Sequence, residues 1–283
     1  MFIARAILAL SLAVAAWVPP ARAADDAPRR VVSMNVCTDQ LAMLLAGEGQ
    51  LHSVSRLAGD PAVSVLADEA GRYVANHGLG EEIFLMRPDL IVAGTFTTRA
   101  TIDMLRRLGF RVEEFAPAGT FEGVRANIRR MGELLGRQQR ADELIAELDT
   151  GLAELAREPA PPLSVAIYSA NSYTSGEGSL SNAVIVAAGL QSIADRLGIV
   201  GVRRLPLEQL VLADPDLVVL GERPYDRPAL AQENFRHPAF RAIASKDRLV
   251  HIPDRYWICG APFTLEAARL LRDAAKARAE AAQ

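Results

Sequence analysis

A fourteen-residue segment occurs twice in the chain and constrains its fold more than any other feature. Residues 81–94 align without gaps to residues 208–221, and seven of the fourteen positions are identical. Each copy has the pattern of a helix that ends at a proline and leads into a short buried strand. A repeat of this kind predicts two similar lobes that contain the same helix–strand unit. A single doubly wound domain is the alternative, and the repeat counts against it.

Short apolar strands alternate with helices on both sides of the middle of the chain. We expect strands at 30–34, 51–54, 89–93, 111–115, 163–168, 217–220 and 248–252. We expect helices at 40–46 with a cap at Thr38-Asp39, from Asp60-Pro61 onward, and at 98–108, 181–188 and 261–282. This alternation is typical of a parallel sheet in an α/β fold, so the sequence predicts two Rossmann-like α/β lobes.

The middle of the chain follows a different pattern. From residue 120 to residue 157 there is no proline, and apolar residues recur at helical spacing. We expect one long helix there, weakest at Gly132 and Gly136, which ends before Pro159. The predicted domains are an N-terminal lobe at 24–119, the long interlobe helix at 120–158 and a C-terminal lobe at 159–283.

The first residues have the layout of a secretory signal peptide. Arg5 precedes an apolar run at 6–17, and Ala21-Arg22-Ala23 is a small-x-small cleavage signal. The run is too short for a spanning helix, which needs roughly 20 residues, and no cysteine follows the cleavage site to carry a lipid. We therefore expect a signal peptide at 1–23 and a periplasmic protein.

Charge and cysteine content limit the classes of function. The net charge is −3 at pH 7 and no basic tract is present, so we expect no binding to nucleic acid. The two cysteines, Cys37 and Cys259, form an isolated pair, which in an oxidising compartment favours a disulfide. The alternative, a thiolate metal site, needs more soft ligands than two cysteines supply.

Candidate ligand-binding residues follow the predicted strands, because open parallel sheets bind ligands at the carboxyl ends of their strands. The loops there are rich in aromatic, polar and arginine side chains, which suit a bulky chelate with planar or anionic groups. In the first lobe the candidates are Met34, Asn35, Arg56, Thr95, Phe96 and Arg99. In the second lobe they are Tyr168, Asn171, Tyr173, Arg203, Arg223, Tyr256 and Trp257.

Signals for catalysis are weak. The chain has no G-x-S-x-G motif, and Gly176-Glu177-Gly178 lacks the third glycine of a dinucleotide-binding loop. The four histidines are scattered without metal-ligand spacing. We expect a binding protein with no catalytic residues, no resident metal and no cofactor. The alternative from a different class is a periplasmic hydrolase or transferase.

Four segments carry a likeness to a known family: residues 30–39, the two copies of the repeat, and residues 256–262. They resemble the Fe/B12 periplasmic-binding family, which includes vitamin B12 and siderophore receptors. The resemblance covers essentially the whole mature chain. It implies a helical-backbone metal receptor that acts as a monomer, captures a metal chelate between its lobes and delivers it to an ABC permease with its ATPase. A ferric siderophore is the first choice and cobalamin a close second. Haem is third, because a tyrosine could bind its iron.

The resemblance also implies roles for individual residues. Family members carry one exposed glutamate in each lobe that docks on permease arginines, and Glu81 and Glu208 hold the matching places. Without the resemblance, each is a solvated glutamate at a helix start, where the helix dipole favours it. Trp257 and Pro262 match the aromatic residue that stands in the family's cleft and the Gly-x-Pro turn that follows it before the final helix. A cysteine pair at 37 and 259 is not general in the family.

Overall fold

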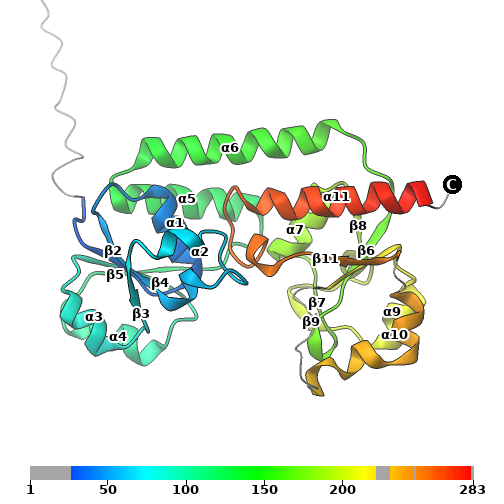
Figure 1. Cartoon of the computed structure of the whole chain (residues 1–283), viewed down its shortest axis with the longest axis horizontal. Helices are drawn as coiled ribbons and strands as arrows, with labels where there is room; N and C mark the ends of the chain where they lie inside the picture. Colours follow the sequence, from blue (N-terminus) through cyan, green and yellow to red (C-terminus); the bar gives the residue numbers. More distant parts are fainter. Residues whose placement is uncertain (1–26, 221–229, 245–246, 282–283) are drawn as a thin grey trace, which may run out of the picture.

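The computed structural model describes residues 27–220, 230–244 and 247–281. They form two α/β lobes beneath a long helix that runs over both of them (Figure 1). The predicted two-lobe α/β fold is thus confirmed. The predicted signal peptide at 1–23 and the candidate Arg223 lie outside the described residues. No helix in the described ranges has the length and hydrophobicity that a membrane span requires.

The first lobe is built on a parallel sheet with strand order β3-β2-β1-β4-β5. Its strands are β1 (Val31–Ser33), β2 (Leu51–Ser55), β3 (Val74–Asn76), β4 (Leu90–Gly94) and β5 (Val112–Phe115). The helices are α1 (Val36–Leu45), η1 (Arg56–Gly59), α2 (Ala67–Ala70), α3 (Gly80–Met86) and α4 (Arg99–Arg107). Side chains alternate across the sheet, so that Val31 packs in the cluster with α1 and Val32 in the cluster with α3 and α4.

The second lobe contains a parallel sheet with strand order β11-β10-β6-β8 and a separate antiparallel ribbon of β7 and β9. The strands are β6 (Ser164–Ile167), β7 (Tyr173–Ser175), β8 (Gln191–Ser192), β9 (Val202–Arg204), β10 (Leu217–Leu220) and β11 (Leu249–His251). The helices are η2 (Ala170–Ser172), α7 (Leu180–Ala187), α8 (Ile193–Arg196), α9 (Leu207–Ala213), η3 (Leu230–Arg236), α10 (Pro238–Ile243), η4 (Asp254–Tyr256) and α11 (Thr264–Ala281). The ribbon was not expected from the sequence.

The prediction of one long interlobe helix is wrong, because the segment forms a hairpin of two helices. They are α5 (Phe121–Leu135) and α6 (Gln138–Arg157). Gly136 ends α5 in the left-handed region at φ 68°, and the amide of Arg137 then donates to the carbonyl of Gly132. Gly132 lets the hairpin close, since a Cβ there would lie 2.5 Å from the Cβ of Ala141. Only α6 runs over both lobes, against α5 and α11 (Figure 1).

Two local predictions in the first lobe also need correction. The expected helix at Asp60 is a single turn, closed by a hydrogen bond from the amide of Ser64 to the carbonyl of Asp60. The next amide, of Val65, bonds instead to the side chain of Gln40, which ends the helical pattern. The first helix starts at Val36 and not after Asp39, because Asn35 supplies its N-cap.

The hairpin turn gives a prediction for stability. Gly136→Ala places a Cβ in the left-handed region, which costs roughly 1–2 kcal/mol in unfolding free energy. Gly59→Ala is the control, because a Cβ there has no atom within 4 Å and φ is ordinary. Denaturant titration should show the loss for Gly136→Ala only. Equal stability of the two variants would contradict the left-handed turn.

Candidate functional site

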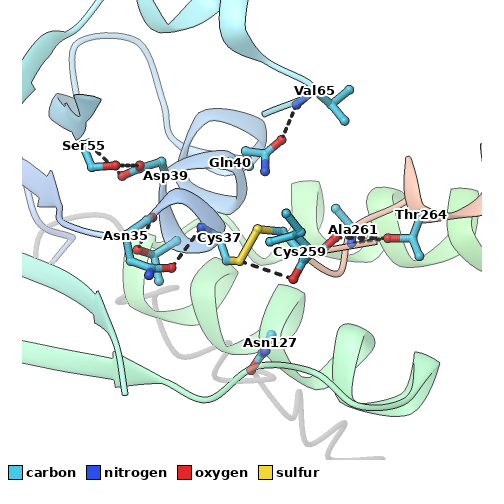
Figure 2. The surroundings of a disulfide bond; sticks show 12 residues. Asn35, Cys37, Asp39, Gln40, Ser55, Val65, Asn127, Cys259, Ala261 and Thr264 are labelled. Carbon is cyan, nitrogen blue, oxygen red and sulfur yellow. Dashed lines mark hydrogen bonds between the residues drawn. A yellow bond between two sulfur atoms is a disulfide. The ribbon is translucent and has the colours of Figure 1, made fainter. Parts of the chain in front are cut away.

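A disulfide joins the two lobes at their junction (Figure 2). Cys37 is the second residue of α1, and Cys259 lies between the last strand and α11. Their Cα atoms are 5.0 Å apart, and the structure pairs them as the sequence predicts. The bond therefore links a segment that follows β1 of the first sheet to a segment that follows β11 of the second.

Two further contacts lie at the same junction. The guanidinium of Arg255 donates to the carbonyl oxygen of Pro61 at 3.2 Å. The backbone of Gly119 touches that of Gly178, since a Cβ on Gly119 would lie 2.1 Å from the carbonyl oxygen of Gly178. Pro61 and Gly119 follow strands of the first lobe, and Arg255 and Gly178 follow strands of the second lobe. The carboxyl ends of both sheets are thus directed toward one junction, which is where ligands bind to sheets of this kind.

In the first lobe, the predicted residues at the strand ends are mostly exposed. Arg56, Thr95 and Phe96 are open to solvent, and Phe96 is 86% exposed. Arg99 is also exposed but is paired with Glu114 at 3.4 Å. Asn35 is half-buried, and its side chain accepts the amide of Cys37 at 3.0 Å. The first lobe therefore offers an exposed aromatic ring and an arginine, while Asn35 serves the helix.

In the second lobe, the exposed candidates gather on the ribbon of β7 and β9. Tyr173 lies directly opposite Arg204, and Arg203 lies opposite Thr174. Tyr173 is 41% exposed and both arginines are exposed. Arg204 also donates to the carbonyl of Asn171 at 3.2 Å, which holds the preceding turn against the ribbon. Arg204 was missed from the sequence, where nothing indicates that it lies opposite Tyr173.

Three predicted ligand-binding residues are buried, and the structure corrects their assignment. Tyr168 is fully buried, stacks on Phe240 at 5.4 Å and donates its hydroxyl to Ser172. Met34 packs in the core cluster beneath α3 and α4. Trp257 packs in the core, and its indole donates to Asp254 at 3.3 Å. These side chains support the strand-end loops from below and present little surface.

Tyr256 is half-buried, and its ring lies beneath the guanidinium of Arg255 at 5.0 Å. It lines a hollow of about 940 Å³ that lies beside α6 and α11. None of the other predicted ligand-binding residues that the structure describes lines this hollow. Within the described residues, no three His, Cys, Asp or Glu side chains are grouped closely enough to hold a metal ion.

A buried carboxyl group lies in the same turn of α1 as Cys37 and is directed toward Ser55 (Figure 2). Asp39 is fully buried and accepts the amide of Ser55 at 3.1 Å and its hydroxyl at 2.5 Å. Burial raises the pKa of Asp39 to about 6, although hydrogen bonds from Ser33 and Ser55 act in the opposite direction. Asp39 thus fixes α1 against the end of β2 at the edge of the site.

Asp39 predicts a pH dependence of stability. Its carboxyl binds a proton more tightly in the folded protein, so its contribution is most favourable below about pH 4 and declines as the pH rises to about 6. The decline amounts to about 3 kcal/mol in unfolding free energy. Asp39→Asn should remove this decline, which denaturant titrations at pH 4.5 and pH 7.5 would measure. Parallel pH profiles for the variant and the wild type would refute it.

Comparison with known proteins identifies related chains. The model of the family described as periplasmic binding protein matches residues 31–256. A cobalamin-binding protein of Halobacterium salinarum is 28% identical over 208 residues, which cover 70% of this chain and 55% of that protein. The chain therefore spans about half the length of the curated relatives that it matches.

Solved structures share the fold over most of the chain. The apo form of the periplasmic heme-binding protein RhuT from Roseiflexus sp. RS-1 is 22% identical and has a TM-score of 0.68, with 90% of this chain and 99% of that chain covered. The ABC-type Fe³⁺-hydroxamate transport system from Saccharomonospora viridis is 19% identical and has a TM-score of 0.67, with 88% and 94% covered. At these identities the likeness shows the two-lobe fold.

Proposed function

The chain belongs to the periplasmic binding protein family, and we propose that it captures a bulky metal chelate between its lobes and delivers it to the permease of an ABC importer. Proteins of this family bind small molecules for transport in the periplasm, and they are not enzymes. The chain is accordingly a periplasmic binding protein and not a hydrolase or transferase. Export by the signal peptide at 1–23 remains part of the proposal.

The ribbon of β7 and β9 carries the proposal for the ligand. It presents Tyr173 directly opposite Arg204, while Arg203, the next residue, points to the other face of the ribbon. The first lobe contributes Phe96 and Arg56, which are exposed at its own strand ends. Aromatic rings stack on planar or bulky chelates, and the guanidinium group of arginine binds a carboxylate through two hydrogen bonds. This combination favours a large chelate with anionic groups over a bare metal ion or a small polar solute.

Two ligand classes fit this surface best. A ferric siderophore with carboxylate or other anionic groups suits the arginines, and the Saccharomonospora protein is named for a ferric hydroxamate. Cobalamin is the second, supported by the name of the Halobacterium relative. Haem is a third candidate, because the exposed phenol of Tyr173 could bind its iron. We propose the siderophore or cobalamin, and place haem after both.

Trp257 provides a direct test of ligand binding. The only other tryptophan is Trp17, in the predicted signal peptide, so the mature protein would carry a single reporter at the lobe junction. Titration with ferric siderophores, cobalamin and haem should show saturable quenching by one of them. Arg204→Ala, opposite Tyr173, should weaken that binding about tenfold, because a charged hydrogen bond is lost.

Arg129→Ala is the matched control, since Arg129 is also an exposed arginine but lies on α5, outside the strand-end loops. It should leave the affinity unchanged. If no chelate alters the fluorescence of Trp257, the proposed ligand class is wrong. If both arginine variants bind like the wild type, the ligand does not use the ribbon.

We also propose that Glu81 and Glu208 dock the protein on its permease. Both are exposed in the first turns of α3 and α9, one in each lobe. No hydrogen bond or ion pair engages either carboxylate within the described residues. A single exposed salt bridge contributes about 0–1 kcal/mol, so two bridges on a preformed surface would mainly set orientation.

Charge reversal should separate docking from ligand binding. Glu81→Arg together with Glu208→Arg should block uptake and leave chelate affinity nearly unchanged, because the carboxylates belong to the docking surface. Each single variant should lose less than half as much in free energy, and Glu133→Arg on α5 is the exposed control. Uptake assays and fluorescence titration give the two readouts. Normal uptake by the double variant would show that both residues are only solvated glutamates at helix starts and do not dock the permease.

A further inference from the structure

The two copies of the fourteen-residue repeat fold into equivalent units, α3–β4 in the first lobe and α9–β10 in the second. Both helices have seven residues and end at a residue in the left-handed region, Arg87 at φ 49° and Asp214 at φ 40°. Ile83 and Leu210 occupy equivalent positions and are both fully buried. The repeat is therefore structural, and its identical positions can be compared one by one.

Four of the seven identities have the same role in the fold of both lobes. The prolines at 88 and 215 are buried where each helix ends, and the leucines at 90 and 217 and valines at 92 and 219 fill the core. Asp89 accepts the amides of Arg29 and Arg30, and Asp216 accepts the amide of Ser164. Each aspartate thereby fixes the start of the neighbouring strand, β1 or β6. These identities are explained by packing and hydrogen bonding.

Two identities have no such role, and both are exposed. They are the glutamates at 81 and 208 and the leucines at 85 and 212. The seventh identity pairs Gly94 with Gly221, which lies outside the described residues. Leu85 is 76% exposed and Leu212 is 85% exposed, although leucine gains from burial. Each leucine lies four residues after its glutamate, so the pair shares one face of its helix. A lone exposed leucine is ordinary, but the same exposed pair in both lobes is not required by the fold.

We propose that Leu85 and Leu212 are the apolar halves of two equivalent docking points, each with its glutamate one helical turn away. The repeated pair implies a partner with two equivalent sites, each a basic residue beside an apolar pocket. A permease built from two equivalent subunits meets that requirement. α3 and α9 lie in different lobes, both on the side of the molecule away from α6 (Figure 1). This inference rests on the proposed function and adds to it the residues that hold the permease.

The two kinds of side chain complement each other physically. An exposed carboxylate attracts a basic residue from a distance but gains little on contact, because water screens the pair. A leucine that enters an apolar pocket supplies the hydrophobic gain and excludes water from the neighbouring ion pair. The glutamates would then guide the approach, and the leucines would slow dissociation.

The experiment measures docking with the chelate-loaded mature protein and a permease–ATPase complex in nanodiscs. The complex used is the one whose ATPase activity the wild-type protein stimulates. Leu85→Gln and Leu212→Gln should each raise the half-maximal concentration for stimulation about tenfold, and the double variant about a hundredfold. Chelate affinity and melting temperature should stay at wild-type values, because both side chains are exposed.

Leu108→Gln and Leu197→Gln are the matched controls, one exposed leucine in each lobe outside the repeat. They should leave stimulation unchanged. If the leucine double variant stimulates like the wild type while the glutamate reversals do not, the leucines are no part of the docking surface. Unequal effects of Leu85→Gln and Leu212→Gln would overturn the two equivalent sites. If the wild type stimulates no importer complex, the proposed function itself fails.

Discussion

One continuous apolar core holds both lobes in place, and α6 lies across it. The buried face of α6, with Leu144 and Leu148, belongs to a cluster that contains Val31 of the first sheet and Val219 of the second. Each fully buried leucine or valine contributes about 1.5–3 kcal/mol. Because the cluster is not divided at the lobe boundary, the lobes cannot separate widely without exposing part of it. The disulfide adds a covalent tie across a sequence separation of 222 residues, which the chain-entropy model values at about 5 kcal/mol.

The parts of the fold that could be predicted are those with local signals. Buried parallel strands are continuous apolar runs, so 217–220 was placed without error, and the repeat revealed the second lobe. The hairpin of α5 and α6 could not be predicted in this way. A glycine such as Gly136 can lie inside a helix or end it, so its presence alone does not predict a turn. The close packing of Gly132 on Ala141 decides that the chain turns here. The ribbon of β7 and β9 pairs short, polar segments that carry no strand pattern of their own.

The sequence indicates which loops follow the strands, but not which side chains in those loops are exposed. Tyr168 lies two residues after Ala166, and both face the same core cluster because the side chains of a strand alternate. The alternation of side chains thus continues one residue past the observed strand and places Tyr168 in the core. Its polar hydroxyl is accommodated there by a hydrogen bond to Ser172. Arg204 was missed for the opposite reason. Its neighbour Tyr173 is distant in sequence, and only the antiparallel pairing brings the two together.

A rigid frame and a two-point docking surface depend on each other. Two docking points on separate lobes bind one partner well only if their separation is fixed before contact, since ordering them on contact would cost affinity. The continuous core and the disulfide keep α3 and α9 in one arrangement. Under the proposed function, the permease then meets nearly the same pair of contacts whether or not the chelate is present. The bound state must therefore be sensed at the strand-end loops, where Phe96 and the β7–β9 ribbon are exposed, and not through a large change in lobe separation.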